Sequence, residues 1–226
     1  KRLKELDLID IDYLHVNRIP YNDEISTKKE VILTPLQQKA VDTILSDTHG
    51  KYLIHGITGS GKTEVYMNVI KSVLNQGKSA MVLVPEISLT PQVLMNFRAR
   101  FGEQVALLHS GLSAGERFDE WKRILSGDAK IVIGARSAVF CPITNLGVII
   151  IDEEHDSSYF SESHPRYVTS MVAENRAKYN NCMLILGSAT PSLVSYSKAL
   201  NGEYKLVEML ERVNGQTLPA INIIDM

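Results

Sequence analysis

The sequence contains few of the residues that stabilise small secreted domains or hold structural metals. Of its 226 residues, two are cysteine, Cys141 and Cys182, and one is tryptophan. The two cysteines lie far apart, each beside an apolar run, so their spacing matches neither a disulfide framework nor a zinc site. We therefore expect two buried, reduced thiols and a cytoplasmic protein.

A long hydrophobic run is also absent. The apolar runs, such as residues 147–151, have the length of a strand and fall far short of the about 20 residues that a membrane-spanning helix needs. The first ten residues mix charged and apolar side chains, unlike the hydrophobic region of a signal peptide. These absences predict a protein that has no membrane partner.

The sequence has no excess of charge of either sign. It contains 24 basic and 26 acidic residues, for a formal net charge of −2. Domains that bind nucleic acids are often strongly basic, so charge alone would not select such a function. Since a typical domain has about 150 residues, the length predicts one large domain or two small ones, with a core that needs no disulfide.

Short apolar runs alternate with amphipathic segments through most of the chain. The runs are residues 52–54, 80–84, 105–108, 130–133, 148–151 and 183–186. They are rich in β-branched residues and apolar at successive positions, as is typical of strands buried on both faces. Helix starts are predicted at Thr34-Pro35 and Thr90-Pro91, and at the capping box Ser113–Glu116. This alternation predicts an α/β fold: a doubly wound parallel sheet with helices on both faces.

The domain organisation follows from the same pattern. Residues 1–30 are charge-mixed and aperiodic, and we interpret them as a connector from an upstream domain, because the chain begins with Lys rather than Met. Residues 31–200 form the expected α/β domain. Residues 201–226 are expected to contain a strand and a linker toward a further domain.

Residues 56–63, GITGSGKT, match the pattern G-x-x-x-x-G-K-[ST] between a predicted strand and a predicted helix. In this phosphate loop, backbone N–H groups point at phosphate oxygens, and the helix N-terminus attracts the same anion. Lys62 is expected to bridge the β- and γ-phosphates and Thr63 to coordinate Mg²⁺. The predicted phosphate-binding residues are Gly56, Thr58, Gly59, Ser60, Gly61, Lys62 and Thr63.

A second acidic motif follows the strand at 148–151. This box is DEEH, residues 152–155. Ligands bind beyond the carboxyl ends of the strands in such sheets, so the box and the phosphate loop are expected at one edge. We expect Asp152 to join Thr63 in holding Mg²⁺ and Glu153 to act as the base for an attacking water, so that Lys62, Asp152 and Glu153 are catalytic. An acidic cluster can instead be a solvated loop start.

Further strings carry a resemblance to a known family. DEEH is similar to the DEAD/DEAH box of superfamily 2 helicases, and GSATPS at 187–192 resembles their motif III. LTPLQQKAV at 33–41 resembles the region whose glutamine, here Gln37, contacts adenine. LVPEISLTPQ at 83–92 and IGARSAVF at 133–140 resemble the motifs that hold the nucleic-acid backbone. HSGLSAGERFDEW and LGVIIIDEEHDSSY narrow the resemblance to the primosomal replication-restart helicases.

The resemblance implies a RecA-like first helicase lobe that uses ATP with Mg²⁺ and moves 3′ to 5′ on DNA at stalled forks. The implied partners are single-stranded DNA, forks, and primosome and single-strand-binding proteins. The family's zinc site is expected only in a second half. The implied coupling residues are Glu154, His155, Ser188 and Thr190. The implied DNA contacts are Arg136, Ser137, Tyr159, Phe160, Arg166 and Tyr167, with backbone amides near residues 88–90.

The resemblance has one departure and leaves alternatives open. In the aromatic-rich loop after DEEH, the family's tryptophan is replaced by His164 or Pro165. Arg136 could pair within the protein, the aromatic side chains could pack the loop against the protein, and His109 could be a coupling residue or a polar residue with local hydrogen bonds.

The alternatives to this function are another superfamily 2 DNA translocase, a nucleotide-sensing module without turnover, and, least favoured, a kinase or GTPase. We expect the lobe alone to hydrolyse ATP weakly.

Overall fold

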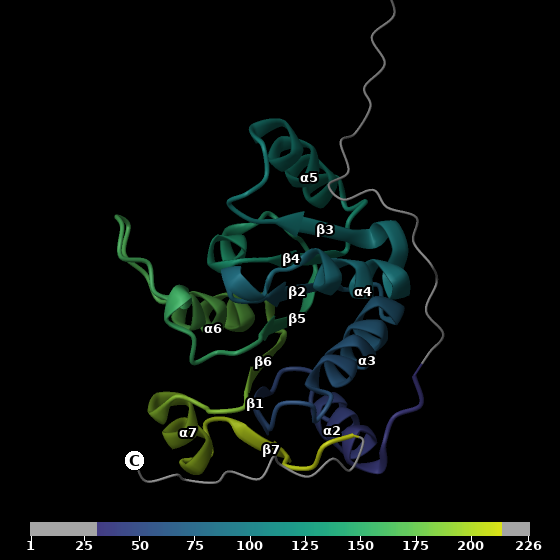
Figure 1. The fold of residues 1–226 in the computed structure, drawn as a ribbon, viewed down its shortest axis with the longest axis vertical. Coiled ribbons are helices and arrows are strands. Elements are labelled where there is room, and N and C mark those ends of the chain that lie inside the picture. Colours follow the sequence, from purple (N-terminus) through teal and green to yellow (C-terminus); the bar gives the residue numbers. More distant parts are fainter. Residues whose placement is uncertain (1–30, 214–226) are drawn as a thin grey trace, which may run out of the picture.

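The computed structural model describes residues 31–213, so the predicted connector 1–30 and the end of the tail lie outside the described residues. The described chain contains a seven-stranded sheet in the order β3-β4-β2-β5-β6-β1-β7, and every neighbouring pair is parallel (Figure 1). The strands are β1 (Lys51–Gly56), β2 (Ser79–Leu83), β3 (Val105–Leu108), β4 (Ile131–Gly134), β5 (Leu146–Ile151), β6 (Met183–Ser188) and β7 (Lys205–Met209). All six predicted runs are strands.

Residues 31–213 contain six α-helices and four short 3-10 helices, of which α2 precedes the first strand and the others follow it. The α-helices are α2 (Pro35–Leu45), α3 (Lys62–Asn75), α4 (Pro91–Phe101), α5 (Ala114–Ser126), α6 (Thr169–Asn180) and α7 (Leu193–Leu200). The 3-10 helices are η1 (Glu86–Ser88), η2 (Gly102–Gln104), η3 (Arg136–Phe140) and η4 (Ser157–Tyr159). None of the helices in the described range is long and apolar enough to cross a membrane.

The helix starts confirm the capping predictions. Thr34, Thr90 and Ser113 are the N-cap residues of α2, α4 and α5, and each hydroxyl accepts a backbone N–H from the first turn. Thr34 and Ser113 also form complete capping boxes with Gln37 and Glu116. Such caps satisfy N–H groups that have no partner within the helix.

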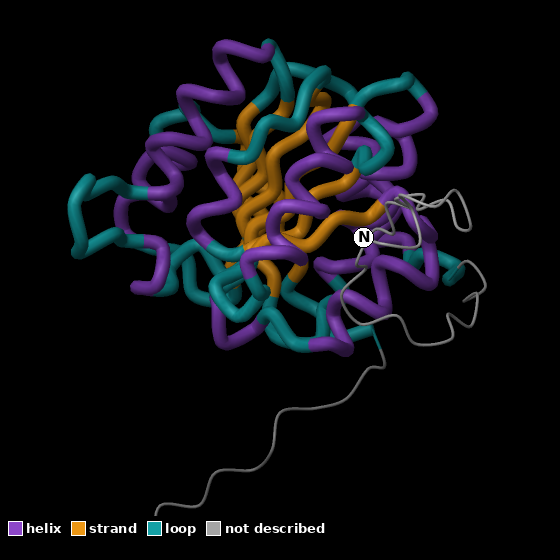
Figure 2. Tube along the Cα trace, turned by 90° about the horizontal axis from the view of Figure 1, so that it is seen from above, coloured by secondary structure: helices purple, strands orange, loops and turns teal. Residues whose placement is uncertain are grey.

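The sheet is covered by helices on both faces, as Figure 2 shows. Successive residues of a strand point to opposite faces, so Ile54 of β1 lies in one buried cluster and Leu53 in the other. The first cluster includes residues of α2, α3 and α4, and the second includes residues of α5 and α6. The predicted doubly wound α/β fold is therefore confirmed.

Strand β7 lies beyond the predicted end of the domain at residue 200, yet it pairs with β1 in the same sheet. At the opposite edge, the backbone N–H of Leu107 in β3 donates to Glu120 Oε2 of α5 at 2.7 Å. The Glu120 side chain is fully buried and pairs through Oε1 with Arg123. A side chain of α5 thus occupies part of the free edge of β3, which limits pairing with another chain.

Replacing Glu120 with alanine removes this acceptor and leaves Arg123 without its carboxylate. Breaking a buried ion pair by removing one partner costs about 3–5 kcal/mol, so Glu120→Ala is expected to lower the urea midpoint of unfolding strongly. Lys122→Ala, an exposed change on the same helix, serves as the control and is expected to stay within about 0.5 kcal/mol of the original. Equal midpoints for the two variants would contradict the role assigned to Glu120.

Candidate nucleotide site and nucleic-acid interface

The phosphate loop joins β1 to α3 at the carboxyl edge of the sheet. Gly61 is the N-cap residue of α3, has a φ of 81°, and receives no side-chain cap. A side chain at Gly61 would also overlap the Gln37 carboxamide, so only glycine fits here. Within the described residues, the buried hydroxyl of Ser60 has no hydrogen-bond partner. An uncapped helix N-terminus beside a buried, unpaired donor fits a bound phosphate group.

Lys62 places a buried cation between the phosphate loop and the acidic box. Its Nζ donates to the carbonyl oxygen of Gly56 at 2.7 Å and lies 3.8 Å from Glu153 Oε1. The side chain is only 9% exposed, so this charge is poorly screened by solvent. The site therefore combines backbone donors with a positive charge, which is the chemistry that binds a polyphosphate.

Gln37 packs against the loop from α2. Its Oε1 accepts the backbone N–H of Thr34 at 2.9 Å, and its Nε2 lies 3.4 Å from the carbonyl oxygen of Ser60 and 3.5 Å from that of Gly61. Gln37 therefore supports the backbone of the phosphate loop, and its contact with adenine stays a prediction.

The chain that follows β7 also touches the phosphate loop. The N–H of Ile57 donates to the carbonyl oxygen of Met209 at 3.2 Å, and the N–H of Val213 donates to that of Gly59 at 3.1 Å. The last described residues are thus bonded to the nucleotide-site backbone itself.

Asp152, at the end of β5, is held by two tyrosine hydroxyls. Tyr66 of α3 donates to Asp152 Oδ1 at 2.9 Å, and Tyr159 of η4 donates to the Asp152 carbonyl oxygen at 2.7 Å. Burial raises the pKa of the Asp152 carboxyl, an effect opposed by the Tyr66 hydrogen bond and the Lys62 charge and increased by Glu153. Burial also raises the pKa of Tyr66, so its hydroxyl stays protonated as a donor. Sequence reasoning missed Tyr66, although it lies four residues after Lys62 on the same helix.

Glu153 adopts a left-handed backbone conformation with a φ of 45°, which is unfavourable for a residue with a side chain. Its Oε1 faces Lys62 Nζ, and its Oε2 lies 3.7 Å from His155 Nδ1. The carboxylate is 35% exposed. Strained residues of this kind are concentrated at functional sites, and here the strain places an accessible carboxylate beside the phosphate loop.

The other two residues of the box bind the segment that follows β6. Glu154 accepts the Ser192 N–H at 2.7 Å and the Ser195 hydroxyl at 2.9 Å. His155 Nδ1 lies 2.7 Å from the Ser188 hydroxyl, which also accepts the N–H of Thr190 at 3.0 Å. The structure therefore brings all four predicted coupling residues into two hydrogen-bonded connections between DEEH and GSATPS.

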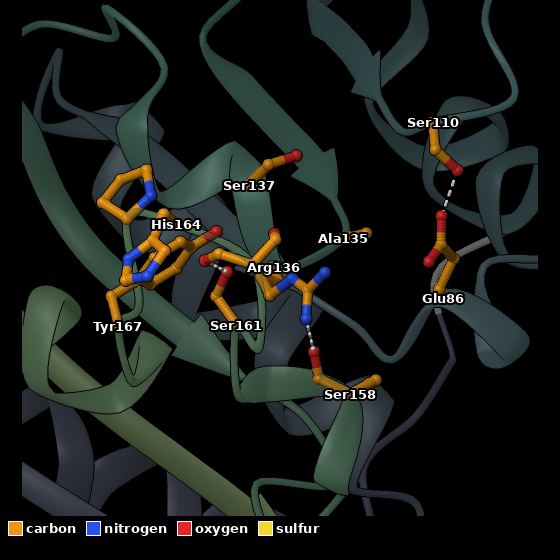
Figure 3. Close-up of a pocket in the computed structure, with 11 residues that line it drawn as sticks. Glu86, Ser110, Ala135, Arg136, Ser137, Ser158, Ser161, His164 and Tyr167 are labelled. Atoms are coloured by element: carbon orange, nitrogen blue, oxygen red, sulfur yellow. Dashed lines mark hydrogen bonds between the residues drawn. The ribbon is translucent and has the colours of Figure 1, made fainter.

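A polar cleft of about 300 Å³ lies beside the predicted DNA-contact residues. Figure 3 shows Arg136 of η3 hydrogen-bonded to Ser158, with Ser161, His164 and Tyr167 to one side of it. The Ser137 hydroxyl points away from these residues, and Glu86 and Ser110 are hydrogen-bonded to each other at the far end of the cleft. The segment between η4 and α6 projects from the body of the molecule in Figure 1. The cleft thus lies between the IGARSAVF segment, residues 133–140, and the aromatic-rich segment, residues 159–167.

Two of the predicted DNA contacts, Tyr159 and Arg136, are instead engaged within the protein. Tyr159 is buried, 3% exposed, and its ring packs in the core, so it is not at the surface where base stacking was expected. Arg136 Nη1 donates to the carbonyl oxygens of Ser158 and Phe160, which is the alternative of pairing within the protein.

The remaining aromatic-rich residues are accessible. Phe160 is 54% exposed, Arg166 is exposed with its Nε donating to the Glu162 carbonyl oxygen, and Tyr167 packs edge-to-face on Phe140 at 4.9 Å between ring centroids. Their predicted DNA contacts stay predictions.

The backbone amides near residues 88–90 and the His109 side chain have local structural roles. The N–H groups of Ser88, Leu89 and Thr90 already donate to backbone carbonyls within their own turn. His109 Nδ1 accepts the N–H of Gly111 at 3.0 Å, and burial lowers the pKa of the imidazole. His109 is therefore a satisfied polar residue here.

Comparison with known proteins identifies the class. Residues 34–198 match the DEAD/DEAH box helicase family, and the chain belongs to that family. The site geometry agrees with it, because the phosphate loop, the acidic box and motif III meet at one sheet edge.

The chain is also similar to particular members of this class. It is 48% identical over 231 residues to the replication restart protein PriA of Bacillus subtilis, covering all of this chain and 29% of that protein. It is 47% identical over 215 residues to PriA of Synechocystis, covering 92% of this chain and 26% of that protein. The predicted resemblance to replication-restart helicases is confirmed, and the chain spans less than a third of these relatives.

Solved structures of helicases share the fold. RecG bound to a three-way DNA junction has a TM-score of 0.61 at 22% identity, covering 83% of this chain and 25% of that one. The UvsW helicase of bacteriophage T4 has a TM-score of 0.57 at 16% identity, covering 83% of this chain and 64% of that one. These similarities confirm the RecA-like α/β fold.

Arg136→Ala removes the donors that tie η3 to the aromatic-rich segment. We expect faster hydrogen–deuterium exchange at residues 157–168, measured by mass spectrometry of peptic peptides, because segments with fewer tertiary bonds open more often. Arg166→Ala is the control, since among the described residues the Arg166 side chain donates to the carbonyl oxygen of Glu162, within the segment itself. Unchanged exchange in Arg136→Ala would contradict this tie.

Proposed function

We propose that the chain is the ATP-binding first lobe of a 3′–5′ DNA helicase that acts in replication restart, where primosomes assemble at stalled forks. The observation that carries this proposal is a chain of contacts that joins a phosphate site to motif III. The Glu153 carboxylate lies within ion-pair distance of both Lys62 and His155, and His155 is hydrogen-bonded to Ser188. The similarity to PriA proteins supports the particular pathway.

The residues at the site divide the chemistry among them. ATP with Mg²⁺, when bound, supplies the phosphoryl group that is transferred to water. Lys62 neutralises phosphate charge, while the Thr63 hydroxyl and the Asp152 carboxylate are the groups that would hold the cation. Glu153, accessible and beside Lys62, accepts the proton of the attacking water at a carboxylate oxygen. Gln37 is proposed to select adenine.

The two hydrogen-bonded connections between DEEH and GSATPS are proposed to transmit structural changes at the nucleotide site to the DNA-binding surface. A change at Glu153 alters the surroundings of His155, which bonds to Ser188, while Glu154 holds the start of α7 through Ser192. Coupling between sites requires such contiguous contacts with two arrangements, and these residues provide the contacts.

DNA is proposed to bind along the cleft between η3 and the aromatic-rich segment. Arg136 and Ser137, which line the cleft, offer phosphate contacts, as does the exposed Arg166 next to the lining residue Pro165. Tyr167 on the lining and the exposed ring of Phe160 offer surfaces for stacking. The solved RecG structure contains a three-way DNA junction, which supports a forked DNA partner. Primosome and single-strand-binding proteins are the further proposed partners.

The lobe is proposed to need a second lobe, and any zinc site is proposed to lie in that other part of the protein. Arginines supplied across the nucleotide by a second lobe would raise the rate, and arginine fingers are worth about 10³–10⁵ in related NTPases. The same site could alternatively serve a different superfamily 2 translocase or a nucleotide-sensing module. A reading frame continuing into a second motor lobe and a cysteine cluster would support the replication-restart assignment.

Two substitutions separate nucleotide binding from hydrolysis. Lys62→Ala is expected to abolish binding of a fluorescent ATP analogue, whereas Glu153→Gln is expected to retain binding and lose phosphate release, because only the base is removed. Lys122→Ala is the surface control. If the unmodified chain binds the analogue but hydrolyses nothing with or without single-stranded DNA, the chain by itself acts as a binding lobe. Robust DNA-stimulated turnover and unwinding by this chain alone would contradict the need for a second lobe.

Phe160→Ala tests the DNA surface. Because stacking of a base on an aromatic ring is worth about 1–3 kcal/mol, we expect the affinity for an oligothymidylate to fall about 5- to 150-fold in fluorescence anisotropy. Tyr179→Ala removes an aromatic residue that is 91% exposed near the C-terminal end of α6, outside the aromatic-rich segment, so the affinity should not change. Equal losses in both variants would argue against the proposed DNA surface.

A further inference from the structure

The buried hydroxyl of Tyr66 lies where three functional segments meet. Tyr66 is one helical turn beyond Lys62 on α3, so the two side chains lie on the same side of the helix. The ring is 1% exposed and its hydroxyl reaches across to Asp152 Oδ1 at 2.9 Å. The helix that begins at the phosphate loop is therefore hydrogen-bonded directly to the acidic box.

The third segment is GSATPS, through Gly187 at the end of β6. A Cβ at Gly187 would overlap the Tyr66 hydroxyl and lie 3.4 Å from Asp152 Oδ1. The carbonyl oxygen of Gly187 accepts the N–H of Glu154 at 3.0 Å. Glycine is thus required here for space, because the hydroxyl occupies the volume that a side chain would fill.

We propose that Tyr66 is a positioning residue that orients the Asp152 carboxylate for the divalent cation, and that Gly187 provides the room for this bond. Tyr66 holds one carboxylate oxygen, Oδ1, which leaves Oδ2 for the ion. The proposal rests on the proposed nucleotide function. It assigns to Gly187, the first residue of motif III, a role in orienting the Asp152 carboxylate. Residues that hydrogen-bond to a metal ligand fix its orientation, and losing one typically costs about 10–100-fold in metal affinity or activity.

A purely structural role for Tyr66 makes a different prediction. If the hydroxyl only satisfied a buried carboxylate, its loss would lower thermal stability and leave the dependence on Mg²⁺ unchanged. Tyr52 offers a matched control, because it is also fully buried and its hydroxyl donates to the carbonyl oxygens of Ile44 and Asp47, away from the site. Both Tyr→Phe changes keep the ring and remove one buried hydroxyl.

The test measures binding of a fluorescent ATP analogue as a function of Mg²⁺ concentration. Tyr66→Phe is expected to raise the half-saturating Mg²⁺ concentration about 10–100-fold, while Tyr52→Phe leaves it unchanged even if the melting temperature falls. A Tyr66→Phe protein with the original Mg²⁺ dependence overturns the proposal. If the unmodified chain shows no Mg²⁺-dependent binding at all, the proposed nucleotide function fails and this inference fails with it.

A double-mutant cycle tests the place of Gly187 in the arrangement. When Tyr66 is present, Gly187→Ala is expected to raise the half-saturating Mg²⁺ concentration, because the methyl group displaces the hydroxyl. In the Tyr66→Phe background the same change should add less, since the hydroxyl is gone and only the close approach of the methyl group to the ring Cζ remains. Fully additive effects of the two changes on the half-saturating Mg²⁺ concentration would overturn the role given to Gly187.

Discussion

The partly buried carboxylate of Asp152 is the group on which the rest of the site depends. A buried charge costs free energy unless surrounding groups replace the lost water, and here the replacements come from different parts of the chain. Tyr66 of α3 donates to the carboxylate and Tyr159 of η4 to the carbonyl oxygen of the same residue. The two tyrosine hydrogen bonds to Asp152 therefore also position the helix that carries Lys62 and the turn that begins the aromatic-rich segment.

The sheet and the position of the site could be predicted because each has a local signal. Strands buried on both faces require continuous apolar runs, and hydroxyl caps such as Thr34 satisfy orphan N–H groups at helix starts. A parallel sheet brings the ends of β1, β5 and β6 to one edge, so the meeting of the phosphate loop with DEEH and GSATPS follows from the topology.

The remaining features depend on tertiary contacts that leave no local pattern. Tyrosine has an apolar ring and a polar hydroxyl, so Tyr159 fits a DNA surface or a core equally well until its neighbours are known. It lies in the core, and Tyr66, which no motif singled out, bonds to a residue far away in sequence. Arg136 is likewise held by carbonyl oxygens, which carry no side-chain signature.

Two backbone hydrogen bonds, between Ile57 and Met209 and between Gly59 and Val213, attach the end of the described chain to the phosphate loop. Strand β7 lies next to the strand that enters the phosphate loop, and the backbone that leaves it remains fastened to that loop. A displacement of the backbone at Met209 or Val213 therefore acts directly on the phosphate loop. Conversely, a rearrangement of the loop must either carry the departing chain with it or break these two bonds.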